Sequence, residues 1–182
     1  MPPDSEESNF RMANEILLKP LGIPSANIYR LKGESEPKTA ADEYERLLRL
    51  IFNVYADVPQ FDLILLGMGS DGHTASLFPQ SDVLLENGKL VASSFVKKFG
   101  QFRLTLTPSV INRAANIIFL VSGADKASAL HELLEGNHNP EMFPAKIVNP
   151  PSGKVFWILD ESAAQSLTLN RTYENFTGYF RR

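Results

Sequence analysis

The 182-residue sequence contains no cysteine and only three histidines. Without cysteine the chain forms no disulfide and offers no thiolate to a metal, and three scattered histidines do not make a zinc site. No apolar run approaches the roughly 18 residues of a membrane span. The opening residues, MPPDSEESNF, lack the basic flank and apolar core of a secretory signal. These absences predict a cytoplasmic protein with no metal site and no membrane contact.

The charge balance argues against large charged partners. The formal net charge is −3, so the chain as a whole does not attract nucleic acid or an anionic membrane, and any anion site has to be a local cluster of cations. A composition of 43% hydrophobic and 21% charged residues is ordinary for a globular protein. We expect one domain over residues 1–167, a tail over residues 168–182, and a monomer whose partner is a small molecule.

The sequence is organised around residues 61–80, FDLILLGMGSDGHTASLFPQ, where an apolar run breaks into a polar loop. Residues 63–66 show no polar alternation, which predicts a strand buried on both faces of a parallel sheet, with ligands just past its carboxyl end. Three glycines follow: Gly67, Gly69 and Gly72. Glycine backbone approaches a ligand closely, and successive N–H groups gather around an anion or a developing oxyanion. His73 comes next, and its imidazole takes up a proton near neutral pH.

Three interpretations of this loop compete. The glycine spacing matches the dinucleotide-binding pattern G-x-G-x-x-G, but that fold needs a full helix next, and Pro79 leaves no room for it. A serine-hydrolase elbow around Ser70 needs a glycine two residues earlier, where Met68 stands. A plain glycine turn with a surface histidine leaves unexplained why Asp71 and His73 crowd onto one loop. Together these two side chains favour a catalytic site.

Residues 67–79, GMGSDGHTASLFP, resemble the signature of the 6-phosphogluconolactonases, which hydrolyse 6-phosphoglucono-1,5-lactone to 6-phosphogluconate in the pentose phosphate pathway without a metal. The related glucosamine-6-phosphate deaminases share G-x-G-x-D-G-H but have a glutamate five residues after the histidine, where this sequence has Phe78. The resemblance implies no cofactor, with His73 as general base for the attacking water and Asp71 holding or polarising its imidazole. The loop amides expected to stabilise the oxyanion are those of Gly67, Gly69, Ser70 and Gly72.

Cations for a substrate phosphate are expected in two places. Residues 96–112, VKKFGQFRLTLTPSVIN, resemble the lactonase segment in which a lysine and an arginine five residues later face the substrate, which implies Lys98 and Arg103 here. Arginine's fork matches phosphate oxygens, and lysine adds a point charge. Lys126 lies in the first turn of a predicted helix, where a cation is favoured only if a bound phosphate offsets the helix dipole. We expect Lys126 to be a third contributor and Lys97 to be solvated surface.

Strands alternating with helices predict a three-layer, Rossmann-like α/β fold with a mainly parallel sheet and helices on both faces. Ser8 caps a first helix, and a second helix from residue 39 is expected to cover the strand at 63–66. Trp157 is expected in the core, with His131 and His138 on the surface. The expected strands lie at residues 28–31, 63–66, 90–95, 103–106, 116–121 and 154–159.

The resemblance runs from residue 2 to about residue 167 but matches only the later part of the lactonases. In those enzymes an Asp-Glu-Arg motif stands directly before a segment like PPDSEESNFRMA, and a Ser-Gly-Gly loop that binds the phosphate lies further upstream. We therefore expect the chain to be N-terminally truncated and to lack the first βαβ portion of the domain. A sugar-phosphate binding protein or inactive remnant is one alternative, and a glucosamine-6-phosphate deaminase is another.

Overall fold

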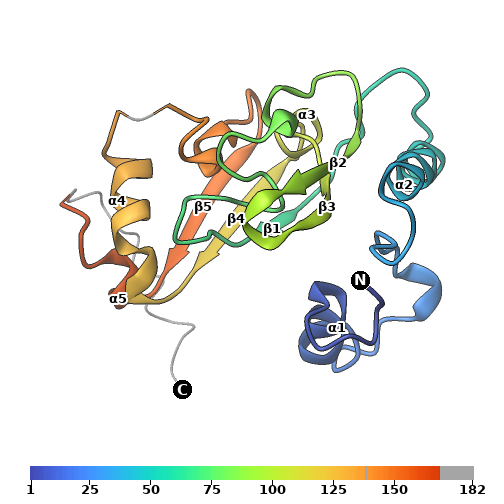
Figure 1. Ribbon diagram of the computed structural model, residues 1–182, viewed down its shortest axis with the longest axis horizontal. Helices are drawn as coiled ribbons and strands as arrows, with labels where there is room; N and C mark the ends of the chain where they lie inside the picture. The colour runs from blue at the N-terminus through green and yellow to red at the C-terminus, as the bar shows by residue number, and fades with distance from the viewer. Residues whose placement is uncertain (138, 169–182) are drawn as a thin grey trace.

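A three-stranded parallel sheet forms the centre of the computed structural model, which describes residues 1–137 and 139–168. Helices alternate with these strands, which is the α/β architecture that the sequence predicts. His138 and all of the predicted tail except Thr168 lie outside the described residues. In the order β1-β4-β5, the strands are β1 (Ile64–Leu66), β4 (Asn116–Val121) and β5 (Lys154–Leu159) (Figure 1).

Helices α4 (Ala127–Leu134) and α5 (Glu161–Ala164) cover one face of this sheet. That face carries Phe119 and Trp157, whose rings stack with centroids 4.0 Å apart and planes at 4°. Trp157 packs against the core, as the sequence predicts. The buried side chains of the same cluster include Ile64, Leu66, Ile117, Val121, Leu130 and Leu133.

The opposite face of the sheet is open to solvent in the described structure. Leu65 is 50% exposed, Leu120 47% and Phe156 45%. Successive residues of a strand point to opposite faces, so these side chains lie on the side away from Phe119. The expectation that the apolar strands are buried on both faces is therefore wrong for the described residues. The reason is that α4 and α5 both pack on the Phe119 side.

A β-hairpin lies beside the sheet. Strands β2 (Val91–Val96) and β3 (Gln101–Leu106) pair antiparallel. The 3-10 turn η4 (Lys97–Phe99) joins them and ends at Gly100, which has a φ of 60°. Because a left-handed backbone costs glycine little, Gly100 lets the chain reverse direction sharply there.

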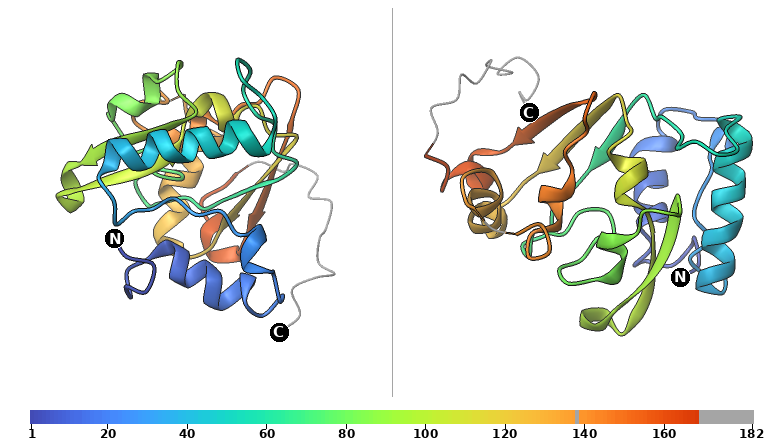
Figure 2. Two further views of the ribbon diagram at one scale, coloured as in Figure 1. Left: turned by 90° about the vertical axis from the view of Figure 1, so that its right-hand side faces the viewer. Right: turned by 90° about the horizontal axis from the view of Figure 1, so that it is seen from above.

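Helix α2 (Pro37–Ile51) packs on this hairpin (Figure 2), and its contacts are with β2 and β3. Its buried side chains Ala41 and Leu48 share a core cluster with Leu90 and Val91. The expectation that this helix covers the strand at residues 63–66 is wrong. Its apolar stripe packs on the inner face of the hairpin. The helical periodicity predicts the stripe but does not identify the surface that it packs on.

The N-terminal segment holds helix α1 (Asn9–Ala13) and a π-helical turn, η1 (Asn14–Leu18). The Ser8 hydroxyl accepts from the Arg11 N–H at 3.3 Å, so the predicted cap is confirmed. The strand predicted at residues 28–31 does not form, because the backbone there pairs with no other strand of the described chain.

Among the described residues, no helix combines the length and apolar character needed to cross a membrane. The remaining short helices are η2 (Ser25–Asn27), η3 (Asp82–Leu85), α3 (Pro108–Ile111), η5 (Ala124–Lys126) and η6 (Pro144–Ile147).

Candidate active site

The loop after β1 is closed by its own hydrogen bonds. The Gly69 N–H donates to the His73 carbonyl at 2.9 Å, and the Gly72 N–H donates to the Gly69 carbonyl at 2.9 Å. The hydroxyl of the fully buried Thr74 donates to the Gly67 carbonyl at 2.8 Å. These bonds shape the loop at the carboxyl end of β1, where the sequence predicts a ligand.

Two of the four amides expected to stabilise an oxyanion are engaged by these bonds. The N–H groups of Gly69 and Gly72 already donate to loop carbonyls, so they are not free for a developing negative charge. The expectation is corrected for these two residues. The remaining two candidates are the amides of Gly67 and Ser70, and Ser70 is exposed.

His73 and Asp71 form a hydrogen-bonded pair on this loop. The Nδ1 atom of His73 lies 2.5 Å from Oδ1 of Asp71, and the His73 backbone N–H donates to the same oxygen at 3.2 Å. Burial raises the pKa of Asp71, but hydrogen bonds from the His73 ring and amide, together with Lys98, outweigh burial and lower that pKa to about 2. An ionised carboxylate only accepts, so Nδ1 carries the proton and Nε2 keeps a lone pair. The pair therefore presents Nε2 as a proton acceptor.

Two glycines of the loop are required by close packing. A Cβ added at Gly69 would overlap the His73 imidazole and the Asp71 carboxylate. Gly72 has a φ of 75°, and a Cβ there would meet the Phe143 ring at 2.6 Å. Any larger residue at position 69 would displace the imidazole from Asp71, so the glycines serve the histidine's position as well as the turn.

Phe78 holds the histidine from its other side. Its ring stacks on the His73 imidazole, with centroids 4.2 Å apart and planes at 25°, and the side chain is buried. The ring of Phe99, from the hairpin turn, meets Phe78 edge-on at 5.6 Å and 71°. In the sequence, Phe78 distinguishes the lactonase pattern from the deaminase pattern, and Phe99 has no predicted role. No spacing rule links these rings, because the contacts depend on how the loop and the hairpin pack.

The hairpin brings two of the predicted phosphate ligands to this cluster. The Lys98 ammonium lies 3.1 Å from Oδ2 of Asp71. The Arg103 guanidinium lies over the Phe99 ring, 5.2 Å from its centroid, and forms no ion pair within the described chain. Lys97 is exposed, as predicted. Of the two predicted phosphate ligands on the hairpin, Arg103 is therefore the one that no acidic side chain of the described residues engages.

Lys126, the third predicted ligand, lies at the start of α4, where its ammonium pairs with Asp125. His131 is a surface residue as predicted, with a side chain 37% exposed and its ring 3.4 Å from Glu135.

Over residues 1–137 and 139–168, no group of three or more histidine or acidic side chains converges as a metal site.

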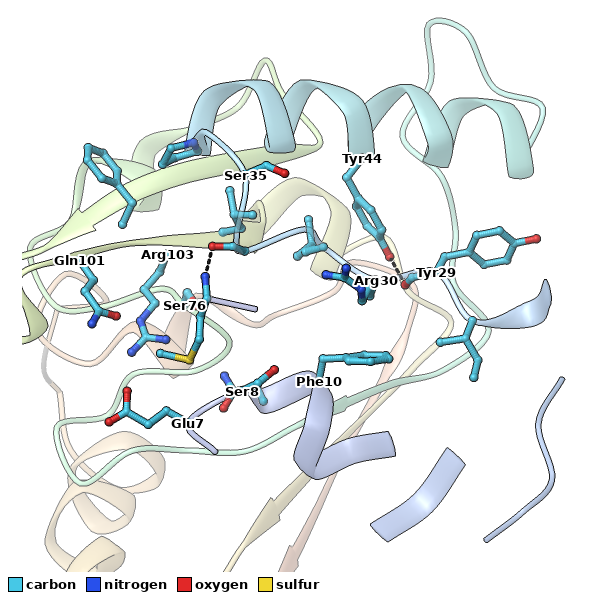
Figure 3. A pocket seen from close by; sticks show the side chains of 18 of the residues that line it. Glu7, Ser8, Phe10, Tyr29, Arg30, Ser35, Tyr44, Ser76, Gln101 and Arg103 are labelled. Carbon is cyan, nitrogen blue, oxygen red and sulfur yellow. Dashed lines mark hydrogen bonds between the residues drawn. The ribbon is translucent and has the colours of Figure 1, made fainter. Parts of the chain in front are cut away.

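Arg103 also lines a cavity of about 440 Å³ between the hairpin, α2 and the N-terminal segment (Figure 3). Ser76, three residues after His73, lies on the same wall. A second guanidinium in the lining, Arg30, is held by Glu34 through two hydrogen bonds of 2.9 and 2.5 Å. Cavities of about 300–1,000 Å³ are typical of small-molecule sites. The volume of this cavity lies in that range, but among the predicted site residues only Arg103 lines it, and His73, Asp71 and Lys98 do not.

The sequence profile of the family described as glucosamine-6-phosphate isomerases/6-phosphogluconolactonase matches residues 1–157. The chain belongs to this family. A 6-phosphogluconolactonase from Synechocystis sp. is 42% identical over 166 residues, which cover 90% of this chain and 68% of that protein. The 6-phosphogluconolactonase of Homo sapiens is 40% identical over 171 residues, covering 93% of this chain and 65% of the human protein. The chain thus spans about two thirds of the length of these relatives.

Solved structures of family members confirm the α/β fold. A structure titled "Crystal Structure of devB protein" superimposes with a TM-score of 0.81 at 35% identity, covering 92% of this chain and 70% of the other. The 6-phosphogluconolactonase of Trypanosoma brucei gives 0.78 at 29% identity, covering 92% and 71%. A monomeric glucosamine-6-phosphate deaminase, at 21% identity and a TM-score of 0.67, shares the fold.

Proposed function

We propose that this chain carries the catalytic loop of a 6-phosphogluconolactonase and hydrolyses 6-phosphoglucono-1,5-lactone to 6-phosphogluconate. This hydrolysis is one step of the oxidative branch of the pentose phosphate pathway. The observation that carries the proposal is the Asp71–His73 pair at the carboxyl end of β1, with Nε2 as its free proton acceptor. The names of the two relatives at 42% and 40% identity support the same reaction.

In the proposed mechanism, Nε2 of His73 takes a proton from a water molecule as its oxygen attacks the C1 carbonyl of the lactone. The amides of Gly67 and Ser70 stabilise the resulting oxyanion, and such a donor contributes about 3 kcal/mol. When the tetrahedral intermediate collapses, the C1 bond to the ring oxygen breaks. The imidazolium then returns its proton to that oxygen, which leaves the open-chain acid and a neutral histidine.

Arg103 is the proposed principal ligand of the substrate phosphate. Its guanidinium lines the cavity and forms no ion pair within the described residues, so its charge is available. Lys98, with a side chain 59% exposed, can reach toward the same phosphate from its place beside Asp71. Lys126 is proposed as a third contributor, which requires its ammonium to leave Asp125.

Replacing His73 tests the proposal directly. His73→Asn removes the proton acceptor while keeping a polar side chain, and we expect lactone hydrolysis to fall at least roughly tenfold, within the range that a general base contributes. The rate is measured by proton release in weak buffer and corrected for spontaneous lactone opening. Circular dichroism of both proteins controls for folding. An unchanged rate would remove His73 from the mechanism.

Arg103→Ala separates phosphate binding from chemistry. Losing a charge-assisted contact costs about 1.5–3 kcal/mol, or roughly ten- to a hundredfold in affinity. We expect that loss with 6-phosphoglucono-1,5-lactone and almost none with the unphosphorylated glucono-1,5-lactone. Lys97→Ala, a cation of the same hairpin turn, is the matched control. Equal losses with both lactones would show that Arg103 does not bind the phosphate.

The chain's length keeps a second function open, because it spans only 68% and 65% of the two curated relatives. A chain that binds a sugar phosphate without hydrolysing the lactone would show 6-phosphogluconate binding by calorimetry and no turnover. A chain extended upstream by the Asp-Glu-Arg motif and the Ser-Gly-Gly loop would then be compared with it. Ammonia release from glucosamine 6-phosphate tests the deaminase, and Phe78 in place of the glutamate predicts none.

A further inference from the structure

The turn of the β2–β3 hairpin contacts both groups that hold His73. Lys98 and Phe99 are consecutive residues of η4. Lys98 reaches Oδ2 of Asp71 at 3.1 Å, while Phe99 meets the Phe78 ring at 5.6 Å. One short turn therefore touches the hydrogen-bonding partner of the imidazole and also its stacking partner.

The two contacts act on His73 in different ways. The two carboxylate oxygens of Asp71 have different partners: Oδ1 faces Nδ1 of His73, and Oδ2 faces the Lys98 ammonium. A cation on Oδ2 offsets part of the carboxylate's charge, so Asp71 attracts the Nδ1–H group of His73 less strongly than it would without Lys98. Phe99, which is 42% exposed, adds little to the core, and its ring supports Phe78 against the imidazole plane.

The same turn is linked to the proposed phosphate ligand. The Arg103 guanidinium lies 5.2 Å from the centroid of Phe99, on the hairpin strand that follows. The charged groups that the described chain brings to this cluster are thus Asp71 from the histidine's own loop and Lys98 and Arg103 from the hairpin. The segment around η6 approaches through the Phe143 ring and the Ala145 amide, which are uncharged.

We propose that Lys98 and Phe99 are positioning residues for His73, and that they make the base responsive to the substrate's phosphate. When a phosphate draws the Lys98 ammonium away from Asp71, the carboxylate acts on the imidazole alone, so Asp71 holds His73 most strongly when the phosphorylated substrate is bound. This inference rests on the proposed lactonase function for its catalytic meaning. Its structural content, a hairpin turn that tunes the Asp71–His73 pair, does not depend on turnover.

The test follows the imidazole of His73 by NMR in the full 182-residue chain labelled with ¹³C-histidine, and His73→Asn identifies the resonance. At a fixed pH, Lys98→Met should move the ring resonances of His73, because the substitution removes the cation from Asp71. Lys97→Met, in the same turn, should not move them. Inorganic phosphate should move the same resonances in the wild-type chain and move them by less than half as much in Lys98→Met.

Phe99→Leu tests whether the Phe99 ring positions His73 through its contact with Phe78. The ring-current shift of the His73 carbon-bound protons should change, and kcat should fall roughly three- to tenfold with KM unchanged, as expected when a reacting group is held less well. Phe95→Leu is the matched control, since Phe95 is 51% exposed on the same hairpin but packs on Phe102.

The outcomes separate the two proposals. Ring resonances of His73 that Lys98→Met leaves unchanged, or that Lys97→Met moves equally, overturn the positioning role of Lys98. Equal effects of Phe99→Leu and Phe95→Leu on the imidazole resonances overturn that of Phe99. Resonances that move as expected in a chain without lactonase activity support the positioning role and reject the proposed function. Resonances that do not move in an active chain support the proposed function and reject the positioning role.

Discussion

Asp71 is the residue on which the site depends most. One of its oxygens accepts from both the ring and the backbone N–H of His73, and the other meets Lys98. Its side chain is 28% exposed, so the charge is only partly screened by water. The residue therefore closes the loop, fixes the tautomer of the base and connects the base to the hairpin.

The lowered pKa of Asp71 predicts a specific acid dependence of stability. Its folded-state pKa is about 2, below the unfolded value of about 3.9. The stabilisation by the ionised form is therefore fully present above about pH 4 and is lost as the pH falls through the folded value. We expect the difference in unfolding free energy between wild type and Asp71→Asn to shrink from pH 5 to pH 2 in urea titrations.

The control for this experiment is Asp125→Asn, whose side chain is 64% exposed at the start of α4. A difference between wild type and Asp71→Asn that stays constant over the same pH range would contradict the assigned pKa.

At the scale of elements, one carboxylate of α2 adds hydrogen bonds to the apolar packing of this helix on the hairpin. Glu45 accepts from the Leu90 N–H at 2.8 Å and the Val91 N–H at 3.4 Å, and it pairs with Arg49 at 2.8 Å. Its side chain is 19% exposed. Burial raises the pKa of Glu45, but the Arg49 contact and the two amides outweigh burial and lower it. Since the hairpin carries Lys98, Phe99 and Arg103, this contact also fixes the site.

Removing that carboxylate should loosen the hairpin. Glu45→Ala leaves two backbone N–H groups without an acceptor, and we expect a loss of about 1–3 kcal/mol in unfolding free energy. Glu43→Ala on the same helix removes a surface ion pair with Lys32, which should cost less than about 1 kcal/mol. Urea unfolding of the two variants measures the difference. Equal losses would show that Glu45 contributes only as a surface charge.

At the scale of the whole molecule, the exposed apolar face of the sheet is the surface that favours self-association. Leu65, Leu120 and Phe156 are each about half exposed on neighbouring strands. A contiguous apolar surface of this kind favours association. We expect the 182-residue chain to associate with rising concentration rather than to stay the monomer predicted from its sequence.

A double variant, Leu120→Thr with Phe156→Thr, should reduce that association because threonine keeps the strand preference and adds a hydroxyl. Light scattering over a concentration series, with circular dichroism as the folding control, measures the effect. Phe95→Thr, which changes an exposed ring on the hairpin, is the control. Association that persists unchanged in the double variant would place the contact elsewhere.

Local chemistry alone predicted much of this protein. The apolar runs at residues 116–121 and 154–159 are strands β4 and β5, and Ser8 caps α1. The pairing of Asp71 with His73, which the resemblance to the lactonases implies, also lies within one short loop, where Nδ1 of His73 is 2.5 Å from Oδ1 of Asp71. These features depend on neighbours along the chain, so spacing and composition determine them.

Only the tertiary structure decided which surfaces meet. Periodicity gives α2 an apolar stripe but not its partner, which is the hairpin rather than β1. The apolar strands have one covered face because α4 and α5 pack on the same side. Lys98 reaches Asp71 across 27 residues, and Phe99 reaches Phe78 across 21, by the docking of a hairpin on a loop. Such contacts are selected by the packing of whole elements, so no local pattern in the sequence records them.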